Sequence, residues 1–310
     1  MHWFLFATIS AILLGFYDVC KKQSLKDNAV IVVLFLNTLI SSVIFLPFLV
    51  LSLSGLWAPG DALYVPEIPL QSHLAIAIKS ILVLSSWFFG YIGIKHLPLS
   101  IVGPMNATRP VLVLLGAVVL FSESLSPLQW CGVATAIVAF YLLSRSGKKE
   151  GIAFSHNRWI YAVAAACILG ACCGLYDKHL MASPAAGGLG LDRMAVQTYY
   201  NFYQCAIMGA IGMTYWWRHR QSQPFHWAWT IPAISIFLSA ADFAYLYALS
   251  LDGALIAVVS MVRRASVVVS FAYAALVLRE KNIRSKAIDL ALVLLSMIFL
   301  ALGTIASTTE

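Results

Sequence analysis

The stretch LSSWFFGY at residues 84–91 returns as LSAADFAY at residues 238–245, with Leu, Ser, Phe and Tyr in the same places. Carrying this register forward aligns Arg109 with Arg263. Two earlier matches occur in the same order, because GFYD at 15–18 returns as GLYD at 174–177 and Asn37 has its counterpart in Asn201. A long internal period indicates a duplicated structural unit. We therefore predict two related halves, residues 1–144 and 159–310, joined by a polar linker at 145–158.

The composition indicates that the chain lives in a bilayer. Of its 310 residues 61% are hydrophobic and only 11% are charged, whereas about a quarter of an ordinary soluble chain is charged. A membrane-spanning helix needs ~20 apolar residues. Such runs lie near residues 3–20, 29–53, 75–96, 100–121, 127–144, 159–180, 194–217, 228–249, 253–278 and 286–305. The predicted fold is an all-α membrane protein with ten transmembrane helices, five in each half.

The N-terminal run and the cysteines are read as structural. MHWFLFATISAILLGFYD at 1–18 has no basic region ahead of its apolar part, so we interpret it as a retained helix and not a signal peptide. The six cysteines have no CxxC or zinc spacing. We expect no metal site and no cofactor. The pI near 9.1 does not indicate nucleic acid, because the basic residues sit in short loops beside helix ends.

The distribution of Lys and Arg predicts the orientation. Five helices are an odd number, so the second half should cross the membrane in the opposite sense. One side collects the basic residues of the linker and of the loops near 21–26, 95, 218–220 and 279–286, while Lys79, Lys178 and Arg193 fall opposite. The positive-inside rule places the rich side in the cytoplasm and both termini outside.

SESLSPLQWCG at 122–132 is similar to the acidic turn that precedes the fifth helix in one transporter family. With ten helices in two five-helix halves, the whole chain resembles the EamA family of the drug/metabolite transporter superfamily. The resemblance implies an inverted-repeat transporter that works by alternating access and holds its substrate between the halves. It also implies a multi-pass protein of a cell membrane, with a bacterial inner membrane favoured. Many members of that family keep their termini in the cytoplasm, so the predicted orientation departs from their pattern.

VGPMNATRP at 102–110 places Arg109 near the middle of an apolar run. A charge at that depth costs ~2.5–3.5 kcal/mol on insertion scales, so it must face a partner or a wet cavity. Pro104 and Pro110 predict a kinked helix, because proline removes a backbone donor. Asn106 lies one turn before Arg109. We expect Arg109 and Asn106 to contact substrate, and the alternative is that Arg109 only forms an internal ion pair.

The second half offers further charges at similar depth. Arg263 and Arg264 point about 100° apart on a helix, so one of them is expected to pair with Asp242 while Arg263 contacts substrate. Asp242 either neutralises an arginine or loads and releases a proton. Trp87, Tyr91 and Tyr245 are expected on the walls of the same pocket.

Two repeated motifs complete the candidate site. Asp18 and Asp177 either pair with Lys21 and Lys178 at helix ends or act with Tyr17 and Tyr176 as gates or proton sites. Asn37 and Asn201 either contact substrate or form hydrogen bonds between helices.

These observations favour a transporter over an enzyme. The predicted function is movement of a small polar metabolite, with an amino acid or carboxylated compound favoured and a proton as a candidate coupling ion. The alternative is a membrane-embedded transferase that uses the buried polar residues. Such an enzyme needs a nucleophile, an acid–base cluster or a metal site, and the sequence clusters no His with carboxylates. A purely structural subunit does not explain paired arginines at depth.

A reporter fused after Glu310 tests the orientation. We expect it to behave as external, because the basic loops hold the other end of the helices in the cytoplasm. The same reporter inserted in the 145–158 linker serves as the control and should be active only in the cytoplasm. Cytoplasmic activity after Glu310 would contradict the orientation and leave the inverted repeat standing.

Overall fold

The computed structural model describes residues 2–309 apart from 62, 122–124, 150, 153, 182–183, 185–186, 220–224, 251–258 and 260–261. The first half contains α1 (His2–Ser24), α2 (Val30–Leu53), α3 (Leu70–His96), α4 (Leu99–Ala107), α5 (Arg109–Phe121) and α6 (Pro127–Lys148). The second half contains α7 (Arg158–Met181), α8 (Arg193–Ile211), a π turn (Gly212–Trp216), α9 (Trp217–His219), α10 (Thr230–Ser250), α12 (Ser266–Leu276) and α13 (Ile283–Thr309). The described residues contain no strand, so the all-α expectation is confirmed.

The helices have the length and composition of membrane spans. Seven helices among the described residues are long and apolar enough to cross a bilayer, and Thr230–Tyr245 forms a shorter apolar helix. The expected run at 253–278 falls partly on 251–258 and 260–261, outside the described residues, and ends in α12. Large apolar side chains are exposed on the outer faces, as on Ile137 at 65% and Ile168 at 55%. The protein is therefore a multi-pass membrane protein.

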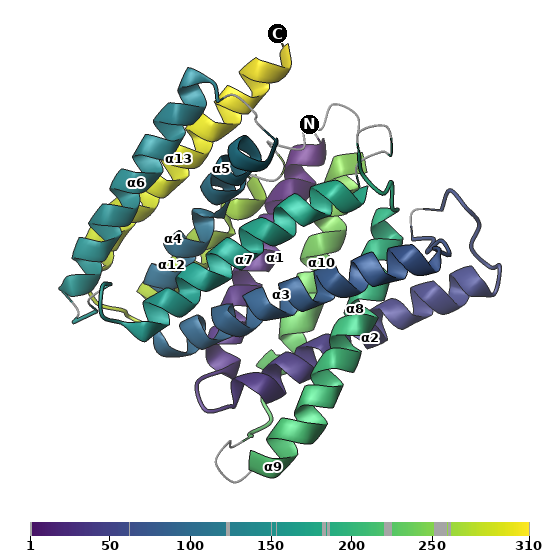
Figure 1. The fold of residues 1–310 in the computed structure, drawn as a ribbon. Coiled ribbons are helices and arrows are strands. Elements are labelled where there is room, and N and C mark those ends of the chain that lie inside the picture. Colours follow the sequence, from purple (N-terminus) through teal and green to yellow (C-terminus); the bar gives the residue numbers. More distant parts are fainter. Residues whose placement is uncertain are drawn as a thin grey trace.

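Helices of the first half pack on helices of the second (Figure 1). The main pairs are α1 with α10, α6 with α13, α3 with α7 and α2 with α8. In the expected repeat α1 corresponds to α7, α3 to α10 and α5 to α12. Exchanging the halves therefore turns the α1–α10 contact into the α7–α3 contact, turns the α1–α12 contact into the α7–α5 contact, and leaves the α2–α8 and α6–α13 pairs unchanged.

Serine hydroxyls join these helix pairs. Ser10 Oγ donates to the Ala241 carbonyl at 2.6 Å between α1 and α10, and Ser86 Oγ donates to the Ala166 carbonyl at 2.9 Å between α3 and α7. Ser296 Oγ donates to the carbonyl of Gly132 at 2.7 Å between α13 and α6. Small polar residues let membrane helices approach closely and add directional bonds.

The expected kink before Arg109 is a break between two helices. α4 ends at Ala107 and Thr108 separates it from α5, whose first residues are Arg109 and Pro110. Proline suits the first turn of a helix because the amide hydrogen it lacks would have no partner there. The break places Arg109 at the start of α5.

The beginning of α4 is fixed by a carboxylate from the loop before α13. Glu280 accepts hydrogen bonds from the amides of Leu99 at 2.8 Å and Ser100 at 3.1 Å. The fully buried Lys286 donates to Ser100 Oγ at 2.8 Å. A negative charge is favourable at a helix N-terminus, so this contact anchors the broken helix to the second half.

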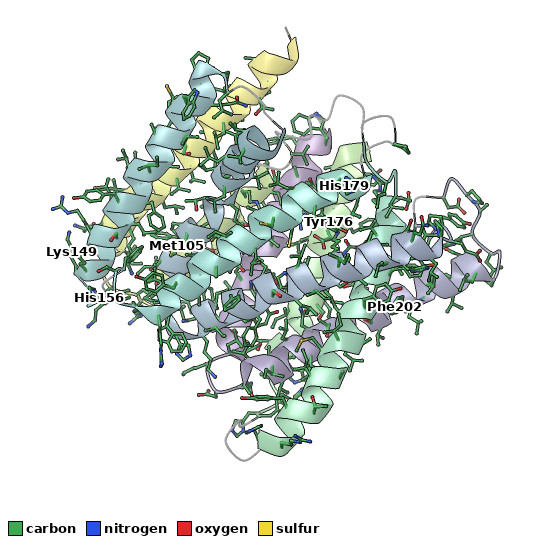
Figure 2. The ribbon with its side chains drawn as sticks, viewed as in Figure 1. Met105, Lys149, His156, Tyr176, His179 and Phe202 are labelled. Carbon is green, nitrogen blue, oxygen red and sulfur yellow. The ribbon has the colours of Figure 1, made fainter. Side chains whose placement is uncertain are left out.

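Both termini lie at one end of the molecule in Figure 1, and α9 lies at the other. The linker between α6 and α7 also lies away from the termini, where Figure 2 labels Lys149 and His156. Two of the basic segments, the linker and α9, thus lie away from the termini.

Two glycines on α3 offer a matched test of its packing against α7. A Cβ on Gly93 would lie 2.2 Å from Val163 Cγ2, whereas a Cβ on Gly90 would lie 3.7 Å from Ala166 Cβ. Gly93→Ala should lower the free energy of unfolding by about 1–3 kcal/mol through overpacking, and Gly90→Ala should be tolerated. Thermal unfolding in detergent measures both variants. Equal stability of the two would contradict the close α3–α7 contact.

Candidate functional site

A cavity of about 340 Å³ lies among helices from both halves. Most of the residues expected at the site line it, namely Tyr17, Asp18, Trp87, Tyr91, Asn106, Arg109, Asp177, Asp242, Tyr245 and Arg263. Lys21 and Arg264 line it as well. The break between α4 and α5 brings Asn106 and Arg109 to this wall. The cavity is therefore a charged chamber inside a helix bundle whose outer surface is apolar.

Three expected site residues lie elsewhere. Asn37 Oδ1 accepts a hydrogen bond from Ser235 Oγ at 2.8 Å, which joins α2 to α10. Asn201 Nδ2 donates to the carbonyl of Gln197 at 2.8 Å within α8. Tyr176 lies on α7 (Figure 2), and its hydroxyl donates to the carbonyl of Ala75 on α3 at 3.2 Å. For Asn37 and Tyr176 the contacts are hydrogen bonds between helices, and none of the three lines the cavity.

Asp242 pairs with Arg263. Asp242 Oδ1 accepts a hydrogen bond from Arg263 Nη2, and the side chains are only 17% and 19% exposed. The guanidinium lies over the ring of Tyr245, with Cζ 4.6 Å from the centroid. Asp242 Oδ2 accepts a second bond from Gln197 Nε2 at 3.2 Å. The sequence left open whether Arg263 or Arg264 pairs with Asp242, and in the structure the partner is Arg263.

On the cavity wall, Asp18 pairs with Lys21, which is the first of the two alternatives for this residue, with 2.6 Å between Oδ1 and Nζ. Lys21 Nζ also lies 3.9 Å from the ring centroid of Tyr17 and 5.5 Å from that of Tyr91. Cations are attracted to aromatic faces, most strongly where water is excluded. Lys21 is buried, so this lysine belongs to the cavity wall and not to the loop that follows α1.

Asp177 pairs with Lys79 of α3, with 2.7 Å between Oδ1 and Nζ. Sequence reasoning assigned Lys79 to the outer face and named Lys178, whose side chain is outside the described part of the structure, as the partner. Lys79 is only 8% exposed, and its Nζ lies 4.9 Å from the ring centroid of Tyr200. The position of Lys79 inside the apolar run of α3 could have indicated a buried ion pair. In the sequence analysis this lysine was used only in the count of basic residues on each side of the membrane.

Arg109 has a different environment. Its Nη2 donates to Asn106 Oδ1 at 3.1 Å, and its buried Nε has no hydrogen-bond partner among the described residues. Gly170 of α7 faces the guanidinium, since a Cβ there would lie 2.9 Å from Arg109 Cζ. Glycine therefore lets α7 close over this side chain.

Arg264 also faces the cavity, contrary to the expectation that it points away from Arg263. The helical turn that carries both arginines ends at Ala265 and α12 begins at Ser266, so a wide chamber at this break receives both side chains. Arg264 and Arg109 line the same cavity. No carboxylate of the described residues lies within ion-pair distance of either one. Two guanidinium groups thus face the chamber without a carboxylate partner among the residues that the structure describes.

A double-mutant cycle tests the Asp242–Arg263 pair. Asp242→Asn and Arg263→Gln should each lower the free energy of unfolding, because each leaves a buried polar group without its partner. The double variant should lose less than the sum, by about 1–3 kcal/mol. A control cycle of Asp242→Asn with Arg284→Gln, whose side chain is exposed, should be additive. Additivity in both cycles would contradict the pair.

Comparison with known proteins shows a similarity to a transporter family over the first part of the chain. Residues 1–145 match the EamA-like transporter family. A protein of Archaeoglobus fulgidus described as an uncharacterized transporter is 28% identical over 149 residues, which is 47% of this chain and 49% of that protein. The chain thus matches about half the length of this curated relative.

A solved structure titled "Crystal structure of protein" superposes with a TM-score of 0.63 at 16% identity and covers 98% of this chain and 97% of that one. At this identity the likeness shows a shared fold along essentially the whole chain. Residues 1–145, somewhat less than half of the chain, are therefore similar to the EamA-like transporter family.

Proposed function

We propose that this membrane transporter carries a small anionic metabolite, a carboxylated compound or an amino acid, through the cavity between its halves. The observation that carries the proposal is the pair of guanidinium groups, Arg109 and Arg264, that face the cavity with no carboxylate within ion-pair distance among the described residues. A substrate carboxylate supplies the missing negative charge. Arginine binds carboxylates through two parallel hydrogen bonds, which adds both energy and direction.

The remaining walls suit the rest of an amino acid. The cavity volume of about 340 Å³ falls in the range of small-molecule sites. Trp87 offers an apolar and aromatic surface, and Asn106 offers an amide beside Arg109. Asp18 lies on the wall as a carboxylate that a substrate ammonium can approach. Tyr91 and Tyr245 complete the aromatic part of the site.

We propose alternating access between two inverted repeats, residues 1–144 and 159–310. The pairing of helices supports this proposal, because the main contacts between the halves persist when the halves are exchanged. The family match ends at residue 145, next to the proposed boundary. In this proposal, the end of the molecule that carries the basic loops lies in the cytoplasm. The proposed location is a bacterial inner membrane.

The proposed gates are the clusters around Asp18 and Asp177. These residues correspond in the repeat, and each pairs with a buried lysine, Lys21 or Lys79, that lies near a tyrosine ring. In an inverted repeat, α1 and α7 cross in opposite directions, which places the two clusters toward opposite ends of the cavity. Opening one ion pair while the other stays closed would expose the substrate to one side only.

Asp242 is the proposed coupling residue. Its counterpart in the first half is Phe88, so no second carboxylate mirrors it. A carboxylate that binds both an arginine and an amide changes its partners when it takes up a proton. Proton loading at Asp242 therefore links pH to the state of Arg263.

Transport by reconstituted protein tests the substrate class. Proteoliposomes are offered a panel of labelled amino acids, monocarboxylates and dicarboxylates, together with amines that lack a carboxyl group. Arg109→Gln and Arg264→Gln should each lower carboxylate uptake by about tenfold or more, as expected for the loss of a charged hydrogen bond. Arg284→Gln removes an exposed arginine and serves as the matched control.

Selective uptake of amines without a carboxyl group would overturn the anionic substrate. Unchanged carboxylate uptake by either folded cavity variant would overturn the role of that arginine.

A further inference from the structure

Gln197 of α8 stands between two ion pairs that the sequence did not connect. Its amide nitrogen donates to Asp242 Oδ2 at 3.2 Å and to the hydroxyl of Tyr200 at 3.3 Å. Asp242 is the partner of Arg263, and the ring of Tyr200 lies beneath Lys79, the partner of Asp177. A continuous chain of polar contacts therefore runs from Arg263 to Asp177.

The chain has a defined direction when Asp242 is ionised. Both carboxylate oxygens are acceptors, Oδ1 for Arg263 and Oδ2 for Gln197. The second hydrogen of the same amide group goes to the oxygen of Tyr200. Tyr200 thus accepts from Gln197, and its own hydroxyl hydrogen points away from the amide.

Protonation of Asp242 reverses this direction. Arg263 holds Oδ1, so the proton goes to Oδ2, which then becomes a donor that faces the amide NH₂ group. With its hydrogen directed at the NH₂ group this contact is lost, and rotation of the amide, which presents the carbonyl oxygen to Asp242, restores a hydrogen bond. A glutamine amide carries both a donor and an acceptor end, which makes this exchange possible without a change of backbone. Tyr200 then faces the carbonyl oxygen and must donate its hydrogen.

The change at Tyr200 reaches Lys79 through the ring. A phenol that donates a hydrogen bond gains electron density in its ring, and a richer ring attracts a cation more strongly. Lys79 Nζ lies 4.9 Å from the centroid of this ring and 2.7 Å from Asp177 Oδ1. A neutral Asp242 therefore draws Lys79 toward Tyr200 and loosens its pair with Asp177.

We propose that Gln197 and Tyr200 are positioning residues that transmit the charge state of Asp242 to the Lys79–Asp177 pair. The inference rests on the proposed transport function and adds a physical link between its coupling residue and one of its gates. The link is one-sided, because the first half has Phe88 at the position of Asp242. The Lys21–Asp18 pair at the other gate has no such bridge among the described residues.

The charges around Asp242 set when it takes up the proton. Arg263 and Arg264 face the cavity beside it, α1 contributes Asp18 and Lys21, and α8 contributes Tyr200. Arg109, Asp177 and Tyr245 line the same cavity, and α2, which also packs on α10, has no titratable residue. A substrate carboxylate that attracts Arg263 weakens its hold on Asp242, so binding of the anion favours protonation.

Infrared difference spectroscopy of the protein in liposomes, recorded across a pH step, tests the relay without any substrate. The wild type should gain a carboxylic-acid band and, over the same pH range, a change in a tyrosine C–O–H band. Asp242→Asn should remove both signals. Gln197→Leu and Tyr200→Phe should each keep the carboxylic-acid band and remove the tyrosine change.

Tyr203→Phe is the matched control, because Tyr203 lies one turn from Tyr200 and its hydroxyl contacts His73 Nδ1 at 2.9 Å, outside the chain. It should keep both signals. Tyr200→Phe removes a single oxygen, so it remains decisive where Gln197→Leu folds poorly. A tyrosine change that persists in Tyr200→Phe or in folded Gln197→Leu would overturn the relay.

Absence of any carboxylic-acid band that depends on Asp242 would overturn the proton site and the relay together. Carboxylate uptake that depends on Arg109 and Arg264 would still stand in that case, so failure of the inference is distinguishable from failure of the proposed function.

Discussion

The cost of a charge inside the membrane determines the rest of this structure. Charged groups at that depth are tolerated only beside partners or in a wet chamber. Here three carboxylates each hold one cation: Asp18 with Lys21, Asp177 with Lys79 and Asp242 with Arg263. Arg109 and Arg264 also reach the chamber, so the described charges around it are unbalanced toward the positive. An interior with excess positive charge suits an anion, and the proposed function rests on that imbalance.

The fold supplies the geometry that makes this imbalance tolerable. The break between α4 and α5 turns Arg109 inward, Gly170 lets α7 lie against its guanidinium, and Glu280 fixes the start of the broken helix. Because the helix pairs join one half to the other, the cavity wall is made of both. In the proposed mechanism, a shift between the halves acts directly on the Lys79–Asp177 pair, which joins α3 to α7.

The sequence was sufficient to predict features that a single residue or a short motif indicates by itself. A repeated motif predicted a duplication, which stays a prediction, and charges in apolar runs singled out Arg109, Asp242 and Asp18, all of which line the cavity. It could not find relations that depend on how helices meet. Lys79 of α3 pairs with Asp177 of α7. Nothing in the sequence around Gln197 indicates its contact with Asp242, because the two residues lie on different helices, α8 and α10. Asn37 lies at a depth in its helix that suited a substrate contact. Its amide oxygen instead accepts a hydrogen bond from Ser235 of another helix.

The proposed function depends on the binding of an anion between Arg109 and Arg264 in the cavity. Anomalous X-ray scattering from crystals soaked with a bromine-labelled carboxylate, such as 4-bromobenzoate, measures this binding. We expect a bromine peak inside the cavity, with the carboxylate oriented toward the two guanidinium groups, and loss of that peak in Arg109→Gln crystals. A peak located outside the cavity, or one that persists unchanged in Arg109→Gln, would contradict it.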